Sequence, residues 1–102
     1  MADEAKTRNT TEESKGFTVK IVSPEKTVFD GICESVTVKT TDGYEGFLRG
    51  RAACCKLLAE DGRISLRKKD ESSPLEFTTQ GGFLYMNDTM LIYTDKAEQN
   101  EA

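Results

Sequence analysis

The chain contains no histidine among its 102 residues. Without an imidazole it cannot build a Ser-His-Asp or Cys-His nucleophile, and it lacks the commonest side-chain ligand of protein-bound transition metals. The glycine-rich segment 43–50 lacks the Lys-Ser/Thr pair of a phosphate-binding loop. We therefore expect no catalytic constellation, no cofactor, no metal and no small-molecule ligand.

Long apolar runs are also missing. No segment approaches the roughly 20 apolar residues of a transmembrane helix, and no basic and then apolar stretch opens the chain as in a secretion signal. We expect the protein to meet a membrane only through a partner, without inserting directly. The formal net charge is −4, and the one basic cluster, Arg67 to Lys69, runs straight into Asp70 and Glu71. A nucleic acid is therefore not an expected partner.

Cysteine is scarce, with three residues, Cys33, Cys54 and Cys55. An odd number without a secretion signal indicates reduced thiols. Cys54 and Cys55 are neighbours, so on a strand they point to opposite faces, which disfavours a shared zinc site or a mutual disulfide. We interpret all three as small structural residues. A nucleophilic Cys54 or Cys55 is the least favoured alternative, which thiol-directed inactivation would test.

What the sequence does contain, between Phe17 and Thr94, is a series of short runs in which apolar and polar residues alternate, separated by pairs typical of tight turns. This pattern predicts an all-β fold, a small two-sheet β-sandwich or flattened barrel. The turn pairs include Asp30-Gly31, Asp42-Gly43, Asp61-Gly62 and Asn87-Asp88. The predicted core residues are Phe29, Val36, Val38, Ile64, Leu66, Phe77 and Ile92.

In two regions the pattern allows more than one interpretation. Ala52 to Glu60 has helical propensity, but its short length and flanking glycines favour a strand. Segments 83–86 and 90–93 are apolar on both faces, which predicts strands in a central position or against a partner. Their Tyr85 and Tyr93 are interpreted as core residues first and as an aromatic binding face second.

The two ends are polar. Residues 1–16 hold no large apolar side chain after Met1, and residues 98–102 hold none at all. Neither segment can offset the entropy lost on ordering, so we predict flexible tails around one domain at 17–97.

The motifs within this domain follow the order found in one family. The chain resembles the N-terminal β-sandwich domain of the epsilon subunit of F-type ATP synthases, in a short form without the C-terminal helical hairpin. The matching positions are Val22-Ser23-Pro24-Glu25, Phe29, Gly31, Glu34, Val36, Val38, Gly43, Gly46, Gly50, Gly81, Gly82 and Asp95. Gly50-Arg51-Ala52-Ala53 departs from the family's Gly-His-x-Pro.

The resemblance implies a non-catalytic central-stalk subunit that links the gamma shaft to the c-ring and couples ion-driven rotation to ATP synthesis. It implies a peripheral location on the cytoplasmic side of the bacterial inner membrane. Because the inhibitory hairpin is missing, we also expect neither self-inhibition nor ATP binding. The expected gamma contacts are Ser23, Arg51, Gly81, Phe83 and Tyr85. The expected c-ring contacts are Asp42, Tyr44 and Glu45, with Tyr44 where the family often has a carboxylate and Glu45 one step later.

A rival hypothesis is a stand-alone β-sandwich adaptor that binds another protein through the loop from Tyr44 to Arg51. Its aromatic and arginine side chains between glycines have the composition of a contact surface. Co-purification with gamma distinguishes the two hypotheses.

Overall fold

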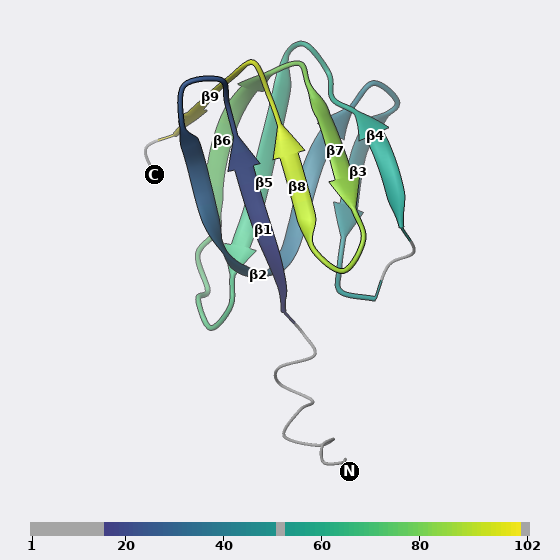
Figure 1. Cartoon of the computed structure of the whole chain (residues 1–102). Helices are drawn as coiled ribbons and strands as arrows, with labels where there is room; N and C mark the ends of the chain where they lie inside the picture. The colour runs from purple at the N-terminus through teal and green to yellow at the C-terminus, as the bar shows by residue number, and fades with distance from the viewer. Residues whose placement is uncertain (1–15, 51–52, 101–102) are drawn as a thin grey trace.

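The computed structural model describes residues 16–50 and 53–100, and none of these residues is helical. Its strands run from one end of the described chain to the other (Figure 1). They are β1 (Phe17–Val22), β2 (Thr27–Thr40), β3 (Gly43–Phe47), β4 (Cys54–Leu57), β5 (Gly62–Lys68), β6 (Leu75–Gln80), β7 (Phe83–Met86), β8 (Met90–Tyr93) and β9 (Lys96–Gln99). The all-β prediction is confirmed, and the segment from Ala52 to Glu60 contains a strand.

The strands pair in the order β4-β7-β8-β1-β2-β5-β6-β9, and β3 pairs with β2. All these pairs are antiparallel except β1–β8. The long strand β2 belongs to both layers of the sandwich. Its first part pairs with β1 in one layer, and its second part pairs with β5 and β3 in the other. A register irregularity between Cys33 and Ser35 lies at the change. Figure 1 shows β1, β8 and β7 in front of β5, β6 and β3.

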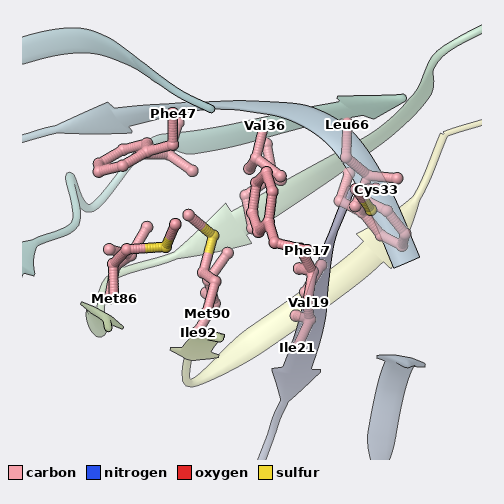
Figure 2. Close-up of a cluster of buried hydrophobic side chains, with 14 of the residues drawn as sticks. Phe17, Val19, Ile21, Cys33, Val36, Phe47, Leu66, Met86, Met90 and Ile92 are labelled. Carbon is pink, nitrogen blue, oxygen red and sulfur yellow. The ribbon is translucent and has the colours of Figure 1, made fainter. Parts of the chain in front are cut away.

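The core fills the space between the layers with the inward-facing half of each strand (Figure 2). Six of the seven predicted core residues are at most 1% exposed: Val36, Val38, Ile64, Leu66, Phe77 and Ile92. Met86 and Met90 are equally buried. A period of two therefore located the interior correctly, since alternate side chains of a strand point to opposite faces.

Phe29 is the exception, because it is only half-buried. Its ring points inward and meets the Phe77 ring edge-on, at 6.2 Å between centroids and 66° between planes. The tip of the ring lies beside Gly31, which has no side chain to pack against it. The predicted turn at Asp30-Gly31 is wrong for a related reason. Both residues are extended within β2, opposite Lys20 and Val19 of β1.

The C-terminal end corrects the predicted boundary. Glu98 and Gln99, expected in a flexible tail, belong to β9, which pairs with β6. The Asn100 N–H donates to the Glu76 carbonyl at 2.8 Å. Backbone hydrogen bonds hold this strand, whose side chains are polar except for the half-buried Ala97, so it shows no apolar alternation. The predicted N-terminal tail lies outside the described residues up to Lys15.

Candidate functional site

An apolar patch covers the outer face of the front layer. Strand register arranges it in two rows, because directly opposite residues share a face. Leu57, Phe83, Tyr93 and Val22 form one row across β4, β7, β8 and β1, and Cys55, Tyr85, Leu91 and Lys20 form the next. We call the apolar members of these rows, Leu57, Phe83, Tyr93, Val22, Tyr85 and Leu91, the apolar face.

Solvent reaches much of this apolar face. Leu57 is 65% exposed, Tyr85 46%, and Phe83 and Leu91 39% each. The rings of Phe83 and Tyr93 stack on each other, with 5.6 Å between centroids and 26° between planes. Contiguous exposed apolar surface is uncommon on monomers and marks interaction sites, and aromatic residues dominate binding hot spots.

The prediction that β7 and β8 are central is confirmed, because each has a neighbour on both sides. The core interpretation of Tyr85 is wrong. Leu84 and Met86 occupy the interior side of β7, so Phe83 and Tyr85 must point outward. The sequence pattern did not single out Leu57, Leu91 or Val22 as site residues, since only the cross-strand register brings them beside the aromatic rings.

Two further predicted gamma contacts, Gly81 and Ser23, are buried and shape the backbone. Gly81 and Gly82 have positive φ angles of 62° and 110° and lead the chain into β7. The Ser23 N–H donates to the Lys26 carbonyl at 2.9 Å, and its hydroxyl donates to the same oxygen at 3.2 Å. Ser23 and Gly81 thus set the backbone path beside exposed residues and do not themselves present side chains to a partner. Arg51 lies outside the described residues.

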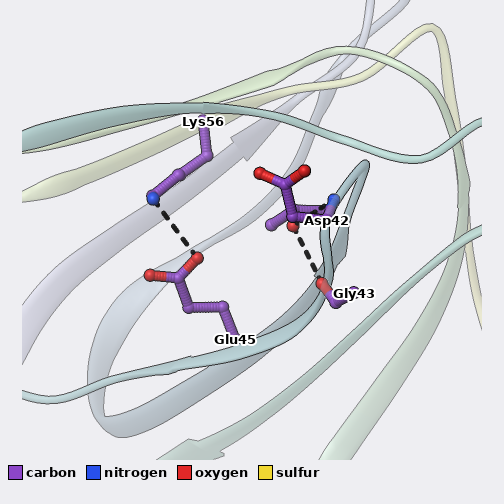
Figure 3. Close-up of polar contacts among 5 residues, drawn as sticks. Asp42, Gly43, Glu45 and Lys56 are labelled. Atoms are coloured by element: carbon purple, nitrogen blue, oxygen red, sulfur yellow. Dashed lines mark hydrogen bonds and ion pairs between the residues drawn. The ribbon is translucent and has the colours of Figure 1, made fainter.

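The β2–β3 hairpin carries the predicted c-ring contacts, and Figure 3 shows Asp42 and Gly43 at its turn. The Thr40 hydroxyl donates to the Gly43 carbonyl at 2.8 Å and accepts from the Asp42 N–H at 3.1 Å. Gly43 has a φ of 114°, which suits a residue without a side chain. Asp42 is exposed at the turn, and Tyr44 is 63% exposed on the outer face of β3.

Glu45 points the other way. It lies opposite Val38, a core residue, and so is on the inner face of the back layer. Lys56 lies opposite the buried Leu84, on the inner face of the front layer. Their side chains form an ion pair of 3.5 Å (Figure 3), 24% and 34% exposed respectively. This pair bridges the two layers beside β3 and β4.

Backbone hydrogen bonds join the hairpin to the start of β7. The Ala59 N–H donates to the Lys39 carbonyl at 3.0 Å, and the Gly81 N–H donates to the Ala59 carbonyl at 3.1 Å. The turns that hold Ser23, Asp42 and Gly81 thus lie at one end of the sandwich (the upper end in Figure 1). Tyr85 lies farther along β7, away from this end.

The described part of the chain has few groups that could bind a metal or react. No cluster of three or more metal-ligating side chains occurs among these residues, and none of them belongs to a helix able to cross a membrane. Cys33 is buried, which raises the pKa of its thiol to about 11, although Lys68 partly opposes the shift. Cys54 is half-buried, whereas Cys55 is exposed beside Tyr85. The structural interpretation therefore suits Cys33 best.

The architecture defines a small β-sandwich with one uncovered apolar sheet face. Residues 16–100 match the family described as "ATP synthase, Delta/Epsilon chain, beta-sandwich domain". The chain belongs to this family.

Individual relatives agree. An ATP synthase epsilon chain of Clostridium novyi (strain NT) is 32% identical over 89 residues, covering 86% of this chain and 66% of the relative. A structure of Euglena gracilis mitochondrial ATP synthase, comprising OSCP, F1 and c-ring, aligns with a TM-score of 0.76 at 18% identity, covering 83% of this chain and 54% of the other. The central stalk and c-ring structure of Tetrahymena thermophila mitochondrial ATP synthase aligns with a TM-score of 0.66 at 21% identity, covering 80% and 65%. At these identities the two structures support the fold alone. This chain spans no more than about two thirds of each.

Proposed function

We propose that this chain is a central-stalk subunit of an F-type ATP synthase, joining the gamma subunit to the c-ring and coupling ion-driven rotation to ATP synthesis. Family membership supports the proposal, as does the likeness to relatives that are ATP synthase epsilon chains. In this role the chain acts by binding its neighbours in the complex, in keeping with its likeness to ATP synthase epsilon chains. It works at the cytoplasmic side of a bacterial inner membrane, held there through the complex.

The observation that carries the proposal is the apolar face. A sandwich of this size stabilises itself by burying apolar side chains between its layers, and the apolar face adds nothing to that interior. Its rows cross four strands, with the stacked Phe83 and Tyr93 rings in one row and Tyr85 in the other. We assign this surface to gamma.

Binding to purified gamma tests the assignment. Tyr85→Ala and Leu57→Ala should each weaken the complex about 10- to 30-fold, the loss expected for a hot-spot residue. Tyr44→Ala is the matched control, because Tyr44 is an exposed aromatic residue on the other layer. Isothermal titration calorimetry measures all three variants. Equal losses for Tyr44→Ala and Tyr85→Ala would place the interface elsewhere.

Cys55 provides a second readout without mutation. It is exposed next to Tyr85 in the second row of the face, so a thiol reagent should modify it in the isolated chain. Bound gamma should protect it. Unchanged labelling in a saturated complex contradicts gamma binding at this face. Failure of gamma to bind at all would instead favour the rival adaptor hypothesis, which the present relatives do not favour.

A further inference from the structure

Strand β9 is an open edge of the back layer. It is the last strand in the pairing order, and within the part of the chain that the structure describes it pairs only with β6. A hollow of about 400 Å³ lies between β9 and the β1–β2 turn, which lines it with Ser23, Glu25 and Lys26. An edge strand can accept a strand of another chain through its unpaired backbone groups.

The hydrogen bonds to β6 decide which backbone groups of β9 remain free. The Asn100 N–H donates to the Glu76 carbonyl at 2.8 Å. In an antiparallel pair, successive residues direct their backbone groups alternately toward the neighbouring strand and away from it. The backbone groups of Lys96 and Glu98 therefore face β6, as those of Asn100 do. Ala97 and Gln99 direct their N–H and C=O groups to the open side.

The side chains of β9 alternate as well. Ala97 is half-buried and packs against the core, so Lys96 and Glu98 point to the outer face, where both are exposed. Among the described residues neither charged side chain has an ion-pair or hydrogen-bond partner. An ammonium group and a carboxylate two residues apart on one face make this edge complementary to a reversed copy of itself.

We propose that β9 pairs antiparallel with β9 of a second copy of this chain, about a twofold axis at Ala97. In this register the free N–H and C=O groups of the two Ala97 residues exchange hydrogen bonds. Lys96 of each copy then lies opposite Glu98 of the other, in the non-hydrogen-bonded position where side chains come closest. The inference does not rest on the proposed function, since it concerns the chain before it joins a complex.

The charges select this register. A shift of two residues is the smallest one that keeps free backbone groups opposite each other. In one direction it places Lys96 opposite Lys96 of the second copy, and in the other direction Glu98 opposite Glu98. Like charges directly opposite each other are destabilising. Because four residues a strand bury far less than the roughly 1,200 Å² of a stable interface, we expect a weak dimer that forms at high protein concentration.

Nuclear magnetic resonance tests the pairing on the ¹⁵N-labelled chain between about 0.05 and 1 mM, concentrations suited to a weak interface. The amide signals of Ala97 and Gln99 should shift with concentration, and that of Tyr85 should not. Glu98→Lys should lower the association constant about tenfold or more, because both pairs then set two ammonium groups opposite each other. Repulsion between whole chains predicts the reverse, since this change brings the net charge of −4 closer to zero.

Mixing two charge variants gives a sharper test. Lys96→Glu alone should associate as poorly as Glu98→Lys. Adding unlabelled Glu98→Lys to labelled Lys96→Glu should restore association, because each pair across the axis then joins a carboxylate of one copy to an ammonium group of the other. The matched control replaces Glu98→Lys in this mixture with Asp88→Lys, which makes the same change of net charge at the exposed β7–β8 turn. It should restore much less.

Three results would overturn the inference. The first is an absence of concentration-dependent shifts at Ala97 and Gln99. The second is a Glu98→Lys chain that associates as strongly as the unmodified one, or an Asp88→Lys mixture that restores association equally well. The third is a set of shifts centred on Tyr85 that disappears in Tyr85→Ala, since the copies would then meet through the apolar face. Melting temperatures should stay unchanged, because Lys96 and Glu98 are exposed.

Discussion

Replacing Gly82 with alanine should destabilise the fold far more than the same change at Gly43. The two glycines have nearly equal φ angles, 110° and 114°, where a side chain costs roughly 1 to 3 kcal/mol of backbone strain. They differ in their surroundings. A methyl group on Gly82 would overlap the Tyr93 carbonyl oxygen and come within 2.7 Å of the Thr94 Cα, whereas nothing lies within 4 Å of one on Gly43.

The expected magnitudes follow from this contrast. Gly43→Ala should cost about 1 to 2 kcal/mol, because part of the strain is offset by the smaller entropy of the unfolded chain. Gly82→Ala must in addition move β8 or the start of β7, for a total of about 4 kcal/mol or more. In a domain of this size each kcal/mol lowers the melting temperature by about 4 to 8 °C.

Urea unfolding followed by far-ultraviolet circular dichroism gives both free energies, with equal m values as the check for two-state behaviour. If Gly82→Ala and Gly43→Ala lose the same stability, the close approach of Gly82 to β8 contributes nothing and the reasoning is wrong. The outcome bears on the site, because the Leu58 N–H donates to the Gly82 carbonyl at 2.9 Å and Phe83 follows directly in the chain.

Three further expectations concern other parts of the fold. A maleimide at pH 7 should modify exposed Cys55 well before buried Cys33, whose raised pKa of about 11 leaves it a thiol; mass spectrometry of a time course shows the order, and equal rates would contradict it. Phe77→Ala should cost about 3 to 5 kcal/mol and Phe29→Ala clearly less, because Phe29 is only half-buried; chemical denaturation compares them. A hydrogen bond from Lys39 holds the pKa of the Asp61 carboxyl below its ordinary value of 3.8. The small stabilisation of the fold by this interaction should therefore be present above pH 3.8 and disappear as pH falls through the lowered pKa of the folded state. Plots of unfolding free energy against pH for Asp61→Asn and the unmodified chain should converge in acid.

The interior was predictable because it depends on alternation alone. Val36 and Val38 are two residues apart on one strand, and so are Ile64 and Leu66, and all four are buried. The position of Phe29 was not, since its burial depends on what lies above and below it. Gly31 offers no side chain to pack against the tip of the ring. That position of Gly31 is known only when β2 is seen to be extended through Asp30-Gly31.

The candidate site required the register of the strands. The sequence placed Tyr44 and Glu45 in one loop as alternative contacts, and a shift of one residue exchanges the two faces of a strand. The pairing of Val38 with Glu45 decides the question, because it puts the carboxylate inside and the Tyr44 ring outside. The apolar face is likewise a product of register, which brings Leu57 of β4 beside Phe83 of β7.

A subunit proposed to join two moving parts must hold its two binding surfaces at a fixed distance and angle. Here the apolar face belongs to the front layer and the hairpin to the back layer. Three connections join these layers near their common end: the hydrogen bonds through Ala59, the bond from the Thr41 N–H to the Leu57 carbonyl, and the Glu45–Lys56 ion pair. Interiors that are densely packed deform little, so a force applied at Tyr44 reaches Phe83 through backbone hydrogen bonds and core contacts. On this reasoning we propose that Glu45 contributes to the coupling from inside the sandwich, because its ion pair with Lys56 holds the layers together.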